Sequence, residues 1–391
     1  MAVPAASVMQ RAGAAFVQGA KATCKRLHEV VPVEVVDDIF GCAIRKQTGV
    51  SLKYMLDFGS SPLERQMVLG AQFLHQELPI RIAHRIAELE NLPYGLSDKA
   101  PIVAVRDMYV STFRTLRASP PVRTTEDERR FTDTIRAIYE KHAGVVPMMA
   151  MGVSELRREL SQQVSLRDVP EIHQFLDGFY LSRIGIRMLI GQHIALHEPP
   201  RPGHIGLIDT KTNPIQVAED AIADAREMCM REYGCAPEVE VFGPPNLTFP
   251  YVPGHLHHML FELVKNSLRA VQDRFEDADF DPPPIRVVVA EGSEDITIKV
   301  SDEGGGIPRS GLPRIWTYLY TTARTPVADQ EDAMADGNGP VVLAGYGYGL
   351  PISRLYARYF GGDLSVLSME GYGTDAYLHL CRLGDKQEPL P

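Results

Sequence analysis

The 391-residue sequence predicts an α+β protein of two domains, an N-terminal all-α four-helix bundle followed by a C-terminal α/β sandwich. Three observations lead to this fold class. Apolar residues recur at helical spacing from residue 57 to about residue 197, with only short breaks. Three prolines then interrupt residues 198–203. Beyond them, strand patterns and glycine-rich turns surround one amphipathic helix at residues 255–270.

The composition is that of an ordinary globular protein, with 45% hydrophobic and 23% charged residues. A net charge of −10 argues against nucleic-acid binding, because there is no excess of lysine and arginine to displace counterions from phosphates. Five scattered cysteines without a C-x-x-C pair favour a reducing compartment. Since no apolar run is long enough to cross a bilayer, we expect no membrane insertion.

The N-terminal segment is basic, and its first 28 residues contain no acidic residue but include Arg11, Lys21, Lys25 and Arg26. This composition fits a mitochondrial transit segment and fits a plain amphipathic helix equally well. We therefore divide the chain into an extension or transit segment at residues 1–40, a helical domain at residues 41–198 and a second domain at residues 204–391.

Within the helical domain, Thr125 and Glu128 have the spacing of a capping box and predict the start of a helix. The longest helix is predicted from about residue 169 to residue 197. Arg183 and Arg187 lie one turn apart on it. Two such guanidinium groups can hold a small carboxylate, and they can equally form structural ion pairs across the bundle.

The second domain begins with a helix that Asn213 caps, that Pro214 opens and that Gly234 ends. Short strands are predicted at residues 238–242 and near Leu247.

The helix at residues 255–270 has an apolar face formed by Leu256, Met259, Leu260, Leu263, Val264, Leu268 and Val271. A second face carries His258, Glu262, Asn266 and Arg269 at steps of four, four and three residues. This arrangement suits phosphoryl transfer, because Glu262 can accept a hydroxyl proton while the Asn266 amide holds Mg2+ without adding charge. His258 can orient Glu262. The alternative is a surface helix whose charged face is only solvated.

A β-hairpin follows, since residues 285–290 and 296–300 alternate about a turn. Its second strand ends at Asp302, directly before the glycines of residues 304–306, where missing side chains allow a ligand to approach. An aspartate in this position can accept a hydrogen bond from an adenine amine.

Two further glycine-rich elements close the chain. Residues 345–349 open a predicted helix at residues 350–359, and backbone N–H groups there can bind phosphate, although such a motif alone is more often a flexible turn. Residues 371–374 form a tight turn with a hydroxyl. The acidic segment 325–340 lacks periodicity and is predicted to be a lid over a nucleotide.

Four of these elements, taken in order, resemble the ATP-binding boxes shared by histidine kinases, gyrase, the Hsp90 chaperones and MutL, at residues 262–266, 302–306, 345–349 and 371–374. Within this superfamily, known as GHKL, the chain from about residue 41 resembles the mitochondrial pyruvate dehydrogenase kinases, and the plant members in particular. The matching segments are residues 52–59, 179–188, 251–253, 256–258, 301–306 and 345–351.

The resemblance implies a regulatory and lipoyl-docking helical domain and a GHKL, Bergerat-type sandwich that binds ATP and Mg2+. It makes Glu262 the catalytic base, His258 its partner and Asn266 the metal ligand, and it places Asp302 and Thr374 near adenine. The nucleotide-binding residues that it implies are Glu262, Asn266, Arg269, Asp302, Gly304, Gly306, Thr321, Thr322, Gly345, Tyr346, Gly347, Tyr348, Gly349, Leu350 and Thr374.

In the family, phosphorylation of serines on the decarboxylase (alpha) subunit inactivates the pyruvate dehydrogenase complex in the mitochondrial matrix. The resemblance also implies a homodimer through the C-terminal sheet, and docking on a lipoyl domain of the dihydrolipoyl acetyltransferase core at Val50, Met55, Phe58 and Phe73. Those four positions fit an ordinary core equally well. A pyruvate or dichloroacetate pocket of animal members corresponds to Tyr109, His142, Arg183 and Arg187.

Animal members continue into a tail with an Asp-Trp pair, whereas this sequence ends at residues 386–391 without one. Exchange of tails between subunits is therefore not expected.

Three other functions stay open at this level. The chain could act on the branched-chain 2-oxoacid dehydrogenase complex. It could be a true histidine kinase with His173 as the acceptor, although an isolated histidine on a long helix is more often structural. It could also be an ATPase or scaffold, because the same boxes serve proteins that only hydrolyse ATP.

Overall fold

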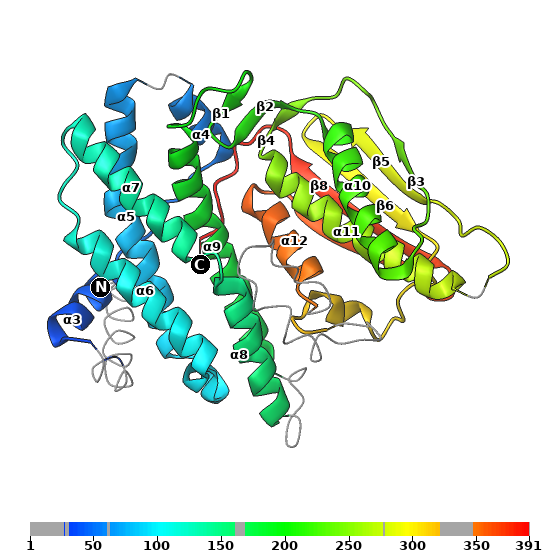
Figure 1. Ribbon diagram of the computed structural model, residues 1–391, viewed down its shortest axis with the longest axis horizontal. Coiled ribbons are helices and arrows are strands. Elements are labelled where there is room, and N and C mark those ends of the chain that lie inside the picture. Colours follow the sequence, from blue (N-terminus) through cyan, green and yellow to red (C-terminus); the bar gives the residue numbers. More distant parts are fainter. Residues whose placement is uncertain are drawn as a thin grey trace, which may run out of the picture. The chain divides into compact units, whose positions relative to one another are not determined.

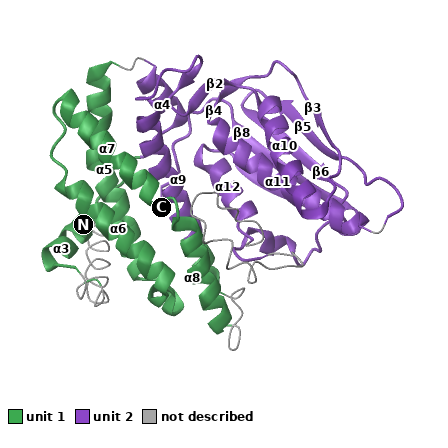
Figure 2. Ribbon diagram, viewed as in Figure 1, with its two compact units in different colours: residues 1–48, 63–175 green, residues 49–62, 176–391 purple. Residues whose placement is uncertain are grey.

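The computed structural model describes residue 27 and residues 31–60, 63–160, 169–276, 278–320 and 347–390. The chain forms two compact units (Figure 2): unit 1 comprises residues 1–48 and 63–175, and unit 2 comprises residues 49–62 and 176–391. These units do not follow the boundary expected between residues 198 and 204. They reflect compactness alone, so the functional domains 41–198 and 204–391 stay a prediction.

Unit 1 is helical, and its elements are α3 (Val33–Ala43), α5 (Glu64–Glu90), the 3-10 helix η1 (Pro93–Asp98), α6 (Ala100–Ala118), α7 (Thr125–Lys141) and α8 (Val145–Leu160). Helix α5 packs against α3, α6 and α7, and α6 packs against α8. The buried apolar residues of each helix form the common core, as the helical periodicity predicts. The expected N-terminal helical region is confirmed.

Two details of the helical region differ from the prediction. Helix α5, with 27 residues, is longer than α9 (Pro170–Ala195), which has 26 and was expected to be the longest. The capping box is formed by Thr124 and Asp127, one residue before the predicted pair: the Asp127 N–H donates to the Thr124 hydroxyl over 3.2 Å, and the Thr124 N–H donates back over 3.0 Å. Glu128 is buried and accepts a hydrogen bond from Thr132 instead.

The helices of unit 2 are α4 (Leu52–Gly59), most of α9, α10 (Pro214–Tyr233), α11 (Pro253–Phe275), the 3-10 helix η3 (Leu312–Trp316) and α12 (Gly349–Tyr359). The Asn213 side chain accepts hydrogen bonds from the first turn of α10, and Gly234 ends that helix with a φ of 76°. Both ends of α10 are therefore where the sequence predicts them.

The strands of unit 2 form two sheets. A three-stranded sheet contains β1 (His204–Ile205), β2 (Ile208–Thr212) and β4 (Phe249–Tyr251). A five-stranded sheet has the order β3 (Val239–Phe242), β5 (Ile285–Glu291), β6 (Asp295–Asp302), β8 (Gly373–Cys381) and β7 (Asp363–Met369). Strands β3 and β5 are parallel, and the other neighbours in the five-stranded sheet are antiparallel. Strand β4 starts two residues after the position expected near Leu247.

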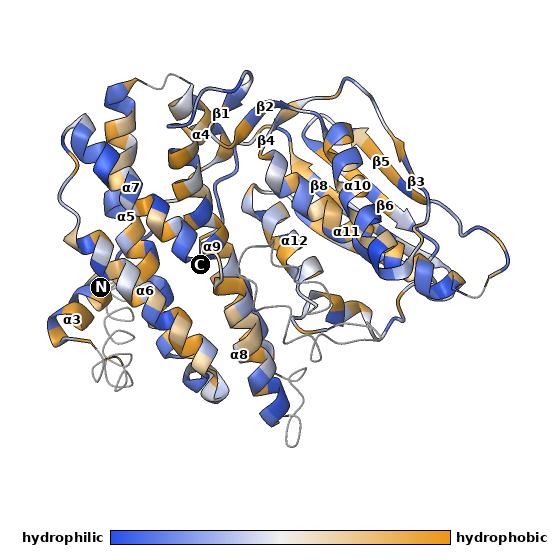
Figure 3. Cartoon of the chain, viewed as in Figure 1, coloured by the Kyte–Doolittle hydropathy of each residue, from blue (hydrophilic) through white to orange (hydrophobic). Residues whose placement is uncertain are grey.

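Helices α10, α11 and α12 pack on one face of the five-stranded sheet, which makes the two-layer sandwich visible in Figure 1. Helix α11 carries both hydrophobic and hydrophilic residues in Figure 3. Its apolar face is buried against the sheet, while its other side is partly exposed. The sandwich confirms the expected C-terminal sheet domain. Among the described helices, none has an apolar stretch long enough to span a membrane.

Candidate active site

Helix α11 places Glu262 at the centre of the candidate site. This residue is only 8% exposed, and its Oε1 accepts a hydrogen bond from the Lys265 ammonium over 2.6 Å. The surrounding apolar face of the helix is buried as predicted, so the backbone that carries Glu262 is held by the core. The alternative of a merely solvated surface helix is thereby wrong for Glu262.

His258 lies one turn before Glu262 and is half-buried. Burial lowers its pKa below the ordinary value, and the nearby Glu262 carboxylate only partly opposes this effect. Its Nε2 atom makes no hydrogen bond with any described residue. The ring packs edge-on against Tyr356, with 5.1 Å between ring centroids. His258 is therefore neutral near pH 7 and can hydrogen-bond without adding charge beside Glu262.

The N-terminus of α12 lies directly against the Glu262 carboxylate. A side chain at Gly349 would overlap Glu262 Oε2, so glycine here lets the helix start against the carboxylate without displacing it. The first turn of a helix carries unpaired N–H groups and a positive partial charge. One carboxylate oxygen thus faces Lys265, and the other faces the turn that was predicted to hold phosphate.

Asp302 ends β6, is 8% exposed and accepts hydrogen bonds through both carboxylate oxygens. The Ser267 hydroxyl donates to its Oδ2 over 2.8 Å, and the Gly304 N–H donates to its Oδ1 over 2.9 Å. Burial raises the pKa of Asp302, and these hydrogen bonds, together with one from the Thr374 backbone, oppose the shift. Thr374 pairs with Asp302 across β6 and β8, so the two residues expected near adenine are direct neighbours.

The glycines after Asp302 have a packing role that the sequence did not suggest. A side chain at Gly304 would overlap Ala270 on α11, and one at Gly306 would overlap the Met369 carbonyl at the end of β7. These residues therefore allow protein segments, rather than only a ligand, to come close. Their part in nucleotide binding stays a prediction.

The remaining predicted nucleotide-binding residues divide into two groups. Asn266 is exposed on α11, one turn after Glu262, and Arg269 lies 3.7 Å from Asp273. Of the glycine motif, Gly347, Tyr348, Gly349 and Leu350 are described, and the Tyr348 ring is fully buried, so only its backbone can face a phosphate. Outside the described residues lie Thr321, Thr322, Gly345, Tyr346 and the predicted lid at 325–340.

Sequence reasoning missed three residues that shape the site: Ser267, Lys265 and Arg274. The Arg274 guanidinium donates to the carbonyls of Glu303 over 2.7 Å and Tyr372 over 2.6 Å. It therefore joins α11 to the turn after β6 and to the turn before β8. Lys265 lies within the box at residues 262–266, and Ser267 is a small polar residue on an otherwise apolar helix face, so only Arg274 gave no local signal.

The residues of the expected carboxylate pocket are described in their separate units. In unit 1, the rings of Tyr109 and His142 are buried with 4.7 Å between centroids, and His142 Nε2 lies 2.7 Å from the Thr112 hydroxyl. In unit 2, Arg183 and Arg187 are half-buried one turn apart on α9.

The expected docking positions differ in exposure. Val50 and Met55 are only 4% and 6% exposed, which supports the interpretation that they are core residues. Phe58 is half-buried and stacks on the exposed Tyr54, with 6.2 Å between centroids. Phe73, in unit 1, is also half-buried.

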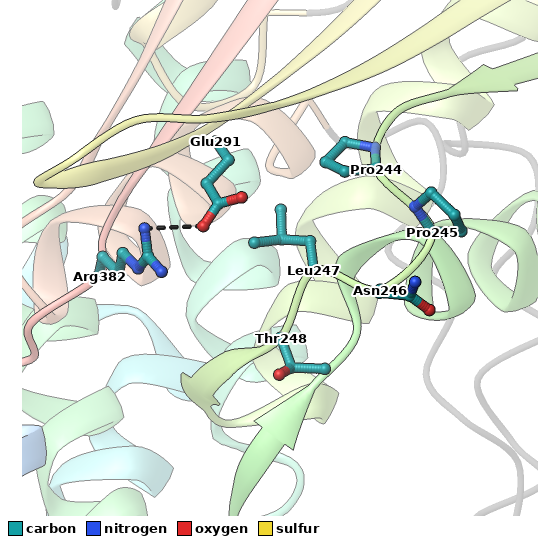
Figure 4. Close-up of a pocket in the computed structure, with 7 residues that line it drawn as sticks. All are labelled: Pro244, Pro245, Asn246, Leu247, Thr248, Glu291 and Arg382. Carbon is teal, nitrogen blue, oxygen red and sulfur yellow. Dashed lines mark ion pairs between the residues drawn. The ribbon is translucent and has the colours of Figure 1, made fainter.

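A separate pocket is shown in Figure 4. It lies at the opposite end of β6 from Asp302. It is lined by residues 244–248 together with Glu291 and Arg382, which form an ion pair of 2.8 Å. The strand register places Glu291 opposite Ile296, near the start of β6, whereas Asp302 is at its end. This pocket is therefore separate from the Asp302 end of the candidate site.

The fold and the site define an ATPase-type domain of the class that contains histidine kinases, gyrase and Hsp90. A family model described as histidine kinase-, DNA gyrase B-, and HSP90-like ATPase matches residues 251–383, and one described as mitochondrial branched-chain alpha-ketoacid dehydrogenase kinase matches residues 49–209.

Similar proteins identify the family within this class of ATPase-type domains. The chain is 60% identical to an Arabidopsis thaliana protein named [pyruvate dehydrogenase (acetyl-transferring)] kinase, mitochondrial, over 94% of this chain and 99% of the relative. It is 38% identical to the Schizosaccharomyces pombe protein of that name, over 88% and 95% of the two chains. The human isozyme 4 is 39% identical, over 88% and 83%. The chain belongs to the mitochondrial pyruvate dehydrogenase kinase family.

Proposed function

We propose that this chain is a protein serine kinase of the mitochondrial matrix that uses ATP and Mg2+ to phosphorylate the decarboxylase (alpha) subunit of the pyruvate dehydrogenase complex and so inactivates it. The observation that carries the proposal is the buried Glu262 carboxylate, which lies against the N-terminus of α12 and one turn from Asn266. The names and high identities of the relatives support the choice of substrate.

Glu262 acts as the general base in this proposal. Lys265 occupies Oε1, so Oε2, which faces Gly349, is the oxygen that accepts the proton of the serine hydroxyl. His258 is neutral and can hold the Glu262 side chain in place without competing for that proton. The exposed amide of Asn266 fits an Mg2+ ion, which when bound neutralises charge on the phosphates.

The nucleotide base lies at the Asp302 end of the sheet in this proposal. The Asp302 carboxylate is fixed by Ser267 and Gly304 and can accept a hydrogen bond from the adenine amine. Thr374 is beside it. Helix α11 carries Glu262 and, five residues later, Ser267, which holds Asp302, so one helix supports both ends of the proposed site. Arg274 fixes the turns at the adenine end.

Partners follow from the proposed function. We expect a lipoyl domain of the acetyltransferase core to contact Phe58 and Phe73, which are partly exposed, rather than the buried Val50 and Met55. A homodimer would use the side of the five-stranded sheet that α10, α11 and α12 leave uncovered. Leu367 and Met369 on the edge strand β7 are 64% and 67% exposed there.

A small carboxylate inhibitor is expected to require Arg183 and Arg187.

The direct test is incubation with labelled ATP, Mg2+ and intact pyruvate and branched-chain dehydrogenase complexes, followed by phosphosite mapping and activity assays. We expect label on serines of the pyruvate complex's alpha subunit, together with loss of activity. Label on the branched-chain complex alone would change the substrate and keep the mechanism. An acid-labile label that disappears in His173→Gln would indicate a histidine kinase, and phosphate release without labelled protein would indicate an ATPase.

A further inference from the structure

Three buried tyrosines of unit 2 pack against one another, and one of them, Tyr348, belongs to the glycine turn of residues 347–349. Tyr180 comes from α9, Tyr318 follows η3, and Tyr348 precedes α12. Their ring centroids are 5.0 Å apart for Tyr318 and Tyr348, 5.5 Å for Tyr180 and Tyr318, and 5.9 Å for Tyr180 and Tyr348. Tilted and edge-to-face arrangements at these distances are favourable for aromatic rings. Each ring therefore contacts the other two.

A hydrogen bond ties this cluster to α9. The Tyr318 hydroxyl donates to Asp177 Oδ1 over 2.6 Å. Asp177 and Tyr180 are three residues apart on α9 and so lie on the same side of that helix. Burial raises the pKa of Tyr318, and the Asp177 carboxylate raises it further, so the hydroxyl stays protonated and keeps donating. One helix side thus holds Tyr318 through a hydrogen bond and Tyr348 through ring contact.

The cluster reaches the candidate active site through the backbone of residues 347–349. A side chain at Gly347, whose φ is 71°, would overlap the backbone of Tyr320, and one at Gly349 would overlap Glu262 Oε2. Tyr348 is the only residue of this turn with a side chain, and that side chain is fully buried in the cluster. The position of the turn relative to Glu262 therefore depends on where the Tyr348 ring is held.

We propose that Asp177, Tyr180 and Tyr318 are positioning residues for ATP: they hold Tyr348, and through it they fix the N-terminus of α12 against Glu262. This inference rests on the proposed use of ATP at that turn. None of the three residues touches a reacting atom, so their effect is on nucleotide binding geometry. A displacement of about 1 Å in such a turn is enough to lower a reaction rate by about 100-fold.

The test compares two substitutions at Tyr180 with a matched core substitution. Tyr180→Leu removes one ring of the cluster, and we expect a rise of about tenfold or more in the KM and dissociation constant of ATP, with the KM of the protein substrate unchanged. Tyr180→Phe keeps the ring and should restore ATP affinity to within about threefold of the wild type. Phe249→Leu, in the three-stranded sheet, removes a buried ring elsewhere and should lower Tm without changing ATP affinity.

Tyr318→Phe is a milder second variant, because it removes only the hydroxyl that donates to Asp177. We expect weaker ATP binding, measured by calorimetry, in a protein whose Tm stays close to that of the wild type. If Tyr180→Leu and Tyr318→Phe lower Tm like Phe249→Leu but bind ATP as tightly as the wild type, the cluster is only core and the inference is wrong. Failure of the wild type itself to bind ATP would instead contradict the proposed function.

Discussion

At the scale of single residues, the site depends on a carboxylate that lies beside two uncharged, half-buried histidines. One oxygen of the Glu262 carboxylate accepts a hydrogen bond from Lys265, and the other faces the first turn of α12. His258 and His255 are neutral because burial lowers the pKa of each ring. His255 and His258 both pack against Tyr356, at 4.7 and 5.1 Å between centroids. A protonated histidine here would place a second positive charge beside Lys265 in a region with little water.

The stability of the fold should therefore decrease on acidification, and His255→Phe should reduce that decrease. The pKa of His255 falls from 6.5 when unfolded to about 3 when folded. Between these two pH values, His255 is protonated in the unfolded chain but not in the folded chain. The contribution of neutral His255 to the free energy of unfolding is therefore complete above pH 6.5 and is lost as the pH falls towards 3. The loss is about 1.4 kcal/mol per pH unit for one histidine.

Calorimetric melting of both proteins between about pH 8 and about pH 5 measures this effect. We expect the two curves of Tm against pH to converge on acidification, with the variant losing less stability. Parallel curves would show that His255 is accessible to protons in the folded protein.

How far single residues can be predicted depends on where their partners lie in the chain. Glu262 and Asp302 are recognisable because each is part of a local motif. Ser267 and Arg274 are not, because Ser267 bonds a residue 35 positions away and Arg274 bonds carbonyls 29 and 98 positions away. Tyr180 reads as an ordinary core residue until the fold brings Tyr348 against it.

At the scale of helices and strands, local chemistry determines most boundaries. Helix α10 begins after Asn213 and ends at Gly234 because a side-chain cap and a left-handed glycine satisfy its two ends. The start of α7 shows the limit of this reasoning, since two overlapping Thr-x-x-acid patterns compete there. The fold selects Thr124 and Asp127, because Glu128 is required in the interior beside Thr132.

This choice of cap predicts a difference between two neighbouring substitutions. Thr124→Ala removes the hydroxyl that accepts from the Asp127 N–H and should lower the free energy of unfolding by about 1 kcal/mol. Thr125→Ala is the matched control, because Thr125 is already inside the helix and is not the capping residue. Denaturant unfolding of both variants measures the two free energies of unfolding. A larger decrease in Thr125→Ala than in Thr124→Ala would show that Thr125 is the capping residue.

At the scale of the whole molecule, sequence position is a poor guide to which segments pack together. Residues 49–62 belong to unit 2, and residues 384–388 pair with them through backbone hydrogen bonds and an isolated β-bridge between Ser51 and Gln387. The Glu388 N–H donates to the Val50 carbonyl over 3.0 Å, and the Val50 N–H donates to the Glu388 carboxylate over 3.1 Å across 338 positions of sequence. No periodicity or local motif can predict such a pairing, whereas the order of helical region and sandwich was predictable from pattern alone.

The proposed homodimer gives a prediction at this scale. Arginine at Leu367 or Met369 would place a charge on the uncovered side of β7 and should shift the protein from dimer to monomer, since burying an unpaired charge in an interface is unfavourable. Met230→Arg is the control, because Met230 is 50% exposed on α10, on the helical side of the sandwich. Light scattering after size exclusion measures the mass of each variant, and a Leu367→Arg protein that stays dimeric would place the interface elsewhere.

The central claim is that Glu262 takes the proton of a serine hydroxyl during phosphoryl transfer to the pyruvate dehydrogenase complex. The most direct measurement compares wild type and Glu262→Gln for ATP binding by calorimetry and for serine labelling of that complex. The amide keeps the shape of the side chain but is a poor base, so we predict labelling lowered by about 100-fold or more with ATP affinity within about threefold of the wild type. Full labelling by Glu262→Gln would contradict the account.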